Sequence, residues 1–364
     1  MKSRPFSQGL LALSCLISVA GCGGGGGDGG GTPAATTTTS TPSPVTYTSA
    51  AAAGELVSYT MDTSSLTYNY TIVESQYGLT GKTGSGKLIA NGDGTYALSN
   101  IPNAKAIILK GGMLVAAIRE NFNGNTRTVS IVGFSNPLTS LAATAATYNY
   151  VSYRCPTLDC SAVAANTEYG TFRIGSDGTW NSCANANYAT DPFCPGSSGT
   201  INTLGGGKWQ ILQESREVGT AMAYQAANGQ NVMLIDMKDP VALGYGVVIG
   251  ATAKAITADD ANGTWQVGVF GKANSGYIIG SMTQTVTLGS NVTTSNVVVN
   301  GAAGSDETST FTLNSPWNGW ATSTAPTPGA TPTLLAGTGM MVEAGSTTTT
   351  SGVPIDLLGI GFKM

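Results

Sequence analysis

Histidine is absent from this sequence of 364 residues, and charged residues make up only 10% of it. Histidine is the commonest general base and metal ligand, so its absence excludes Ser-His-Asp catalysis, Cys-His catalysis and His-ligated zinc. Sixteen Lys and Arg stand against 20 Asp and Glu, which gives a net charge of -4. Nucleic-acid binding needs clustered basic side chains, so we expect no nucleic-acid partner.

The N-terminal segment has the pattern of an export signal. Lys2 and Arg4 precede an apolar run from Leu10 to Ala20. This run is shorter than the roughly 20 apolar residues of a membrane-spanning helix and has the length of a secretory leader core. Residues 19–22 read Val-Ala-Gly-Cys, which resembles the lipobox of bacterial lipoproteins.

The lipobox resemblance implies cleavage before Cys22, a thioether-linked lipid on that cysteine, and an acylated amino group. Several acyl chains exceed what stable membrane anchoring requires. Gly23 occupies the position where an inner-membrane retention signal has aspartate, which favours the outer membrane, on its periplasmic or cell-surface face. The alternative is an ordinary signal peptide with an unmodified cysteine.

Composition divides the chain into four parts. Residues 1–21 form the lipoprotein signal peptide, and residues 22–44 form a Gly-, Thr- and Pro-rich tether without apolar anchors, which predicts disorder. The remaining length is typical of two domains. We place the boundary near Ser135-Asn136-Pro137, giving an N-terminal β domain at 45–138 and a C-terminal β domain at 139–364.

Short strands separated by Gly-containing turns dominate the body, and no long helical period is present. Alternation of apolar and polar residues indicates strands. The clearest runs are 67–72, 105–110, 113–118, 128–134, 147–153, 171–174, 208–212, 232–237, 264–270, 277–287 and 308–313. We therefore predict an all-β fold, with an N-terminal antiparallel meander and a larger C-terminal β-barrel or sandwich, a lipocalin-like barrel being one form.

Four cysteines remain beyond the leader and the lipobox: Cys155, Cys160, Cys183 and Cys194. An even number in an exported chain predicts two disulfides, with three alternative pairings. Zinc is the alternative, but the spacings differ from those of zinc ribbons, so we expect no metal. Residues 147–153, 169–174 and 179–182 are predicted strands around these cysteines. If the three strands are consecutive and antiparallel, the loops after the first and the third lie at the same end of the sheet, and these two loops contain all four cysteines. They then either form a rigid rim around a binding mouth or simply brace long loops.

Two tryptophans, Trp317 and Trp320, lie in a Pro/Gly turn and are candidate ligand or interface aromatics. The alternative is that they plug the end of a barrel or sandwich.

Asp236 and Asp239 form a carboxylate pair of the kind that glycosidases use, but nothing indicates a perturbed pKa for either carboxyl group.

Two further segments resemble ligand loops only superficially. Residues 81–87 resemble a phosphate-binding loop, yet Leu88 replaces the magnesium ligand and a strand follows, which predicts a hairpin. Residues 259–263 lack the ligand spacing of a calcium loop, and we expect a hairpin turn there.

Several stretches of the body form a recognisable set together with the Gly-rich run after Cys22: residues 67–71, 77–81, 148–152, 169–172, 176–180 and 335–339. Through these stretches, most of the body resembles a family of bacterial lipoproteins of unknown function. The resemblance implies no activity and no site residues.

These observations favour a non-enzymatic, lipid-anchored outer-membrane protein that acts as an envelope or surface interaction module. We expect no catalytic residues and no cofactor, and we expect the lipid anchor to hold the chain at a membrane. The partner is an unknown protein, glycan or small apolar ligand. The first alternative function is a lipocalin-like binder of a small apolar ligand, and a carboxylate-based hydrolase is a more distant one.

Overall fold

In the computed structural model, residues 44–364 are described apart from gaps at 52–53, 93, 102–104, 111, 123–124, 157–165, 192–193, 195, 227, 240–243, 274–275, 288–290, 300–301, 304–306, 325–331, 337–338 and 349–353. Cys22, the leader and nearly all of the tether lie outside the described residues, as does Cys160. The described part is all-β, which confirms the predicted fold class, and the predicted strand runs all fall on strands.

The first barrel is a closed up-and-down barrel of eight antiparallel strands. Its strands are β1 (Val45–Ala51), β2 (Glu55–Asp62), β3 (Thr67–Glu74), β4 (Thr83–Ala90), β5 (Tyr96–Leu98), β6 (Lys105–Lys110), β7 (Met113–Phe122) and β8 (Asn125–Phe134). Residues 81–87 lie in the hairpin that joins β3 to β4, as the sequence predicts. Closure comes from the pairing of β1 with β8.

The second barrel repeats this architecture after a 3-10 turn, η1 (Leu141–Thr144). Its strands are β9 (Ala146–Cys155), β10 (Asn166–Ile174), β11 (Thr179–Ala184), β12 (Ser197–Gly205), β13 (Lys208–Gln213), β14 (Arg216–Gln225), β15 (Asn231–Asp239) and β16 (Gly244–Thr252). Pairing of β9 with β16 closes it.

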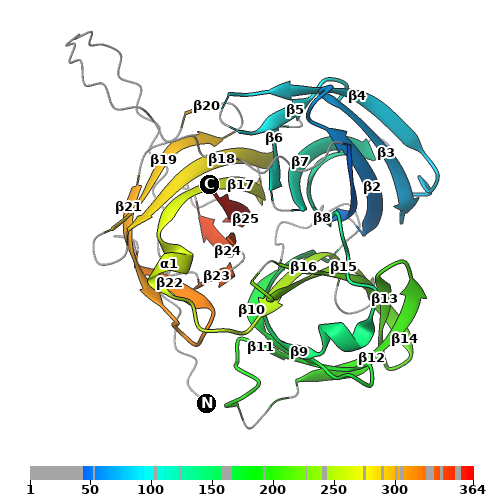
Figure 1. Cartoon of the computed structure of the whole chain (residues 1–364), viewed down its shortest axis with the longest axis vertical. Helices are drawn as coiled ribbons and strands as arrows, with labels where there is room; N and C mark the ends of the chain where they lie inside the picture. Colours follow the sequence, from blue (N-terminus) through cyan, green and yellow to red (C-terminus); the bar gives the residue numbers. More distant parts are fainter. Residues whose placement is uncertain are drawn as a thin grey trace.

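The third sheet has nine strands. An additional pairing between β18 and β19 closes it into a ring of hydrogen-bonded strands, so we call it the third barrel. It contains β17 (Gly263–Ala273), β18 (Gly276–Thr287), β19 (Asn291–Val299), β20 (Ala302–Ala303), β21 (Glu307–Leu313), β22 (Trp320–Thr324), β23 (Pro332–Ala336), β24 (Met340–Thr348) and β25 (Pro354–Lys363). The C-terminal region thus holds two barrels where the sequence suggested one larger body. Figure 1 shows the three barrels arranged around a common centre.

The helix α1 (Ala258–Ala261) replaces the hairpin turn expected at 259–263. Thr257 and Asp260 form a capping box, in which each side chain accepts a hydrogen bond from the other residue's backbone N–H. A capping box stabilises a helix start, so the two aspartates initiate a helical turn and the expected hairpin does not form.

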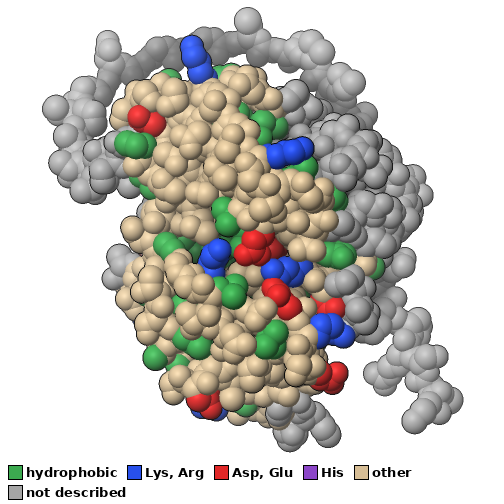
Figure 2. All heavy atoms as spheres, turned by 90° about the vertical axis from the view of Figure 1, so that its right-hand side faces the viewer, with side chains coloured by type: hydrophobic (Ala, Val, Ile, Leu, Met, Phe, Trp, Pro, Cys, Tyr) green, Lys and Arg blue, Asp and Glu red, His purple; other side chains and the backbone are tan. Residues whose placement is uncertain are grey.

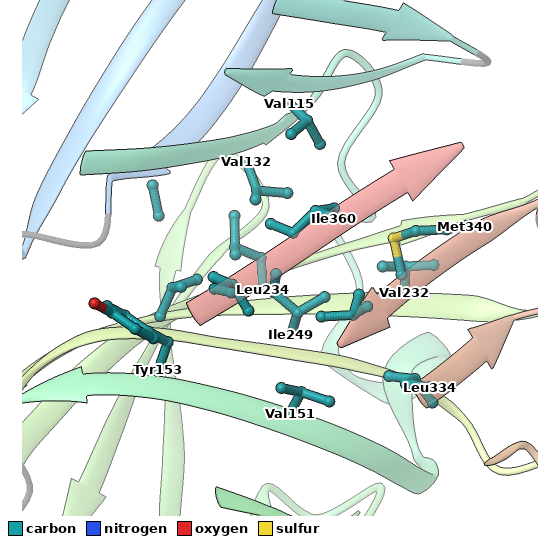
Figure 3. Packing of buried hydrophobic residues seen from close by; sticks show 14 of the residues in the cluster. Val115, Val132, Val151, Tyr153, Val232, Leu234, Ile249, Leu334, Met340 and Ile360 are labelled. Atoms are coloured by element: carbon teal, nitrogen blue, oxygen red, sulfur yellow. The ribbon is translucent and has the colours of Figure 1, made fainter. Parts of the chain in front are cut away.

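A hydrophobic core lies between the barrels as well as inside them. It joins outward-facing side chains from all three barrels, among them Val132 of the first, Ile249 of the second and Ile360 of the third. Figure 3 shows these residues converging from separate sheets. Strands at the centre are therefore buried on both faces. In β9, Tyr148 and Tyr150 face the barrel interior, while Val151 and Tyr153 face the shared core.

Candidate functional site

The mouth of the second barrel is the strongest candidate site. Strands β9, β11, β13 and β15 all end at this rim, because neighbouring strands are antiparallel. The opposite end is closed by η1: the Tyr148 hydroxyl donates to the Thr144 carbonyl oxygen at 2.7 Å, and Asn231 donates to that of Ala143 at 2.9 Å. Leu141 packs against the interior cluster there. The barrel therefore has one plugged end and one polar end.

Alternation along the strands directs charged side chains into this polar mouth. Arg154 follows Tyr148 and Tyr150 on the interior face of β9, and Glu168 shares the interior face of β10 with Phe172. Arg154 Nη2 lies 3.3 Å from Glu168 Oε2, and the Tyr150 hydroxyl donates to Glu168 Oε1 at 2.5 Å. Burial, together with the Glu168 carboxylate, raises the pKa of Tyr150 well above its usual range.

A second ion pair lies on β14 and β15 of the same mouth. Arg216 Nη2 donates to Asp239 Oδ2 at 2.9 Å, and the Asp239 side chain is fully buried. In the barrel, β16 lies between β15 and β9. The strand β15, which carries Asp239, is therefore roughly 10 Å from β9, which carries Arg154. The mouth therefore holds two guanidinium–carboxylate pairs of zero net charge.

Four buried polar atoms in this mouth have no hydrogen-bond partner. They are Ser152 Oγ, Arg154 Nε, Gln213 Oε1 and Arg216 Nε, and they make up four of the eleven such atoms among the described residues. Each buried polar atom without a partner costs about 1–3 kcal/mol of folding free energy. Four such atoms on the interior face of one barrel end are a feature that a bound polar group would satisfy.

A disulfide braces the rim. Cys183 at the end of β11 is joined to Cys194 in the following loop, and this selects among the pairings left open by the sequence. Cys155, which ends β9, is also disulfide-bonded. The ends of β9 and β11 lie at the same rim, as the assumed strand order implies.

Removing the Cys183–Cys194 bridge is expected to lower the free energy of unfolding by about 3 kcal/mol, because it closes a short loop whose entropy in the unfolded chain then rises. The double variant C183S/C194S, measured by urea denaturation, checks this. Wild-type protein treated with a reductant should lose more stability, since Cys155 is then freed as well. An unchanged midpoint in the double variant would contradict the bracing role.

The structure does not place the carboxylates of Asp236 and Asp239, the pair that the sequence suggested, side by side. Asp236 and Asp239 lie on opposite faces of β15: Asp239 enters the second barrel, whereas Asp236 shares the outward face with Val232 and Leu234. The two carboxylates therefore do not form the facing pair that glycoside hydrolysis requires.

Asp236 belongs instead to a charge cluster between the first and second barrels. Lys238 Nζ contacts Glu74 Oε2 at 3.0 Å and Glu217 Oε1 at 2.5 Å. Lys208 also lies 3.8 Å from Glu74, so one carboxylate of the first barrel is held by two lysines of the second. Figure 2 shows acidic and basic side chains gathered where these two barrels meet.

Asp236 is fully buried beside this cluster, and neither of its oxygens has a hydrogen-bond partner. Burial raises its pKa well above the usual range, Lys238 lowers it, and Glu74, Glu55 and Glu217 raise it further. The folded protein thus favours the protonated acid, which is the form with the smaller desolvation cost.

Replacing Asp236 with asparagine is expected to increase stability at neutral pH and to reduce its pH dependence. A folded-state pKa above the unfolded value means that stability is fully present below the unfolded pKa and is lost as the pH rises through the folded pKa. Urea denaturation between pH 4 and 8 measures both effects. The exposed control variant D259N should keep the wild-type slope, and a D236N slope equal to the wild type would contradict the assignment.

The two tryptophans of the Pro/Gly turn lie between the second and third barrels. Trp320 is fully buried in the shared core, and Trp317 is half-buried against it. Trp317 Nε1 donates to Asn149 Oδ1 at 2.7 Å, and both indoles contact the ring of Tyr169 on β10. Trp320 is thus closed to a ligand, and its contacts make this turn a joint between two barrels.

The interior of the third barrel is built from a smaller set of fully buried side chains than the interior of the first or second. At one end, α1 closes it, with Trp265 Nε1 donating to the Ala261 carbonyl oxygen at 2.9 Å. Towards the other end, the inward-facing side chains of Val269, Met282 and Phe311 are only partly buried. The interior clusters of the first and second barrels hold more fully buried aromatic and aliphatic side chains, although they too include partly buried ones.

Glu343 lies inside this third barrel, two residues from the buried, inward-facing Met341. It has no hydrogen bond or ion pair with any described residue. A Cβ on its cross-strand neighbour Gly359 would lie 2.7 Å from Glu343 Cγ, so the side chain lies directly over that glycine. Burial raises the pKa of Glu343 to about 7.

Two kinds of feature, a metal-binding group and a membrane-spanning helix, are absent from the described residues. Within the described ranges, no three Cys, Asp or Glu residues are grouped so that they could hold a metal ion. The same ranges contain no helix with the length and hydropathy needed to cross a bilayer. The sequence predicted a mouth rimmed by cysteines as one alternative but did not identify the charged residues inside it. These residues come from four strands, and only the strand registers place them on one interior face.

No family model matches the chain, and no curated protein matches it in sequence. Solved structures similar to it include a DUF3598-family protein of unknown function from Nostoc punctiforme (12% identity, TM-score 0.27, covering 62% of this chain and 100% of that one). Transferrin-binding protein B from serogroup B Neisseria meningitidis (10%, 0.30) and a mutant of the protein from Haemophilus parasuis (7%, 0.29) also match. Each covers 85% of this chain, which spans 66% of either neighbour. These TM-scores assign the chain to none of these proteins.

Proposed function

We propose that this chain is a lipid-anchored, non-enzymatic interaction module of the outer membrane that binds its partner at the mouth of the second barrel. The observation that carries the proposal is the disulfide-braced mouth with four buried polar atoms that have no partner. The shared core supports it, because it joins three barrels into one body and so holds the rim in place. The lipobox and the tether support the location.

Cross-linking in intact cells tests the binding role. A photo-cross-linking amino acid at Thr190, exposed on the rim loop, should give a discrete adduct with one envelope partner. The matched control is Leu204, which is exposed at the opposite end of the same barrel. A discrete adduct at Thr190 alone supports the proposal. Identical patterns at both positions, or no adduct at either, would overturn it.

Replacing Cys22 with serine is expected to abolish lipid attachment and leave an uncleaved precursor, because the thiol is the acylated group. Metabolic labelling with palmitate and immunoblotting of membrane fractions measure both outcomes. Replacing Cys15, which lies within the apolar run, is the matched control and should label normally. Normal labelling of C22S would refute the anchor.

A second candidate function, binding of a small apolar ligand, rests on the partly buried apolar side chains of Val269, Met282 and Phe311 in the third barrel. Val269 faces that interior, so Val269→Trp should fill it and reduce binding of a hydrophobic fluorescent probe by at least several-fold. The exposed substitution Leu66→Trp on the first barrel should leave probe binding unchanged. Equal probe binding by V269W and wild type would exclude this site.

A further inference from the structure

We infer that the mouth of the second barrel binds a small organic acid that also carries a hydroxyl or amide N–H group, with Arg154, Arg216 and Ser152 holding its carboxylate. This inference rests on the proposed binding role of the mouth and adds the chemical class of the ligand. Three of the four polar atoms without a partner are hydrogen-bond donors: two guanidinium Nε–H groups and the Ser152 hydroxyl.

The guanidinium geometry favours a carboxylate as the acceptor. Each arginine uses Nη2 for a carboxylate of the protein, Glu168 for Arg154 and Asp239 for Arg216, and leaves its Nε–H without an acceptor. Hydrogen bonds from a guanidinium to a carboxylate are charge-assisted and stronger than bonds to a neutral oxygen. A ligand carboxylate thus satisfies these donors more strongly than a neutral group does, and this gain has to exceed its repulsion by Glu168 and Asp239.

The remaining atom adds a second requirement. Gln213 Oε1 is an acceptor without a donor, and Gln213 lies opposite Arg216 in the strand register. A ligand that fills the site completely therefore offers a donor as well as a carboxylate. Hydroxy acids, sugar acids and N-acyl amino acids share this chemistry, whereas simple carboxylates lack the donor.

The side chains that fill the barrel below the mouth limit how far a ligand can enter. The η1 plug and the interior aromatic rings of Tyr148 and Phe172 fill the barrel below the mouth. At Gly170 a Cβ would lie 2.1 Å from the Cys183 carbonyl oxygen and 3.1 Å from Tyr150 Cε1, so the backbone of β11 and the Tyr150 ring are packed closely around this position. The ligand therefore enters only the upper part of the barrel, which suits a single small acid or the acidic end of a longer chain.

Isothermal titration of the full folded body tests the inference. Glucuronate and N-acetylalanine are the two probes. D-glucose is the control without a carboxylate, acetate is the control without a hydrogen-bond donor, and sodium chloride is the control for ionic strength. We expect saturable binding of at least one probe, at least tenfold tighter than acetate or glucose. Binding of glucuronate alone identifies a sugar acid, and binding of N-acetylalanine alone identifies an acylated amino acid. No difference between the probes and the salt control would overturn the inference.

The key variant is Ser152→Ala, because the hydroxyl it removes has no partner to lose and the fold should be retained. S152A should bind the probe several-fold more weakly with an unchanged melting temperature, and Arg154→Gln should bind it at least tenfold more weakly. Arg173→Gln is the matched control, since Arg173 lies on the outer wall of the same barrel over Tyr188. Wild-type affinity in S152A and R154Q would also overturn the inference. A discrete Thr190 cross-link without acid binding would reject this ligand class and leave the interaction role standing.

Discussion

Replacing Trp320 with alanine is expected to lower the free energy of unfolding by about 3–5 kcal/mol, the largest stability loss among the changes considered. Trp320 has no exposed surface, and its ring contacts Tyr169 of the second barrel edge-on at a centroid distance of 5.4 Å. Truncation removes this contact and leaves a cavity in the core that the three barrels share. Its Nε1 has no hydrogen-bond partner, so the loss is one of packing alone.

Urea denaturation followed by tryptophan fluorescence and circular dichroism measures the effect. Trp320→Phe retains an aromatic ring in the same place and should cost clearly less. Because Trp320 joins the second and third barrels, W320A should also separate the unfolding of the third barrel from that of the others, so that the two probes give different midpoints. A loss below 1 kcal/mol with coincident midpoints would show that the barrels do not depend on this joint.

The second large effect is a fall of roughly 3 kcal/mol in stability as the pH rises from about 4.5 to above 7, caused by Glu343. Its folded pKa of about 7 lies above the usual value of 4.5 because burial disfavours the charged carboxylate. The folded protein then binds a proton that the unfolded chain has already released. Stability from this group is therefore fully present below pH 4.5 and is lost as the pH rises through 7.

Glu343→Gln is the matched variant, since it keeps the shape and removes the titration. It should be more stable than the wild type at pH 8, about equal to it at pH 4.5, and nearly flat in between, apart from the contribution of Asp236. The double variant D236N/E343Q removes both contributions. If E343Q retains the full pH dependence of the wild type, Glu343 is solvated and does not have the raised pKa.

The strands and the fold class follow from local patterns. The alternation in residues 67–72 and 264–270, with Gly-containing turns between strands, predicts antiparallel strands without any tertiary information. At the turn 176–178, Gly178 has φ +84 and Asp177 accepts hydrogen bonds from the Thr179 backbone and hydroxyl. Such turns are local, so the sequence is sufficient to locate them.

The division into three barrels was harder to predict. Residues 232–237 read as one apolar run interrupted only by Asp236, which is the pattern of a strand buried on both faces. Unlike the alternating runs with which it is grouped in the sequence analysis, this run is apolar at successive positions, and it marks where the second barrel packs against its neighbours. Both faces of β15 are covered, one by the barrel interior and the other by the shared core.

The strands and turns can be predicted from the amino-acid sequence because each depends on residues close together in the chain. The absence of histidine chemistry follows from composition alone. Which charged side chains meet depends on the three-dimensional arrangement of the strands. Arg154 and Asp239 share a mouth, while Asp236 and Asp239, three residues apart, face opposite ways. The reason is that strand alternation sets the face of each side chain, but barrel closure and register decide which distant strands share an interior.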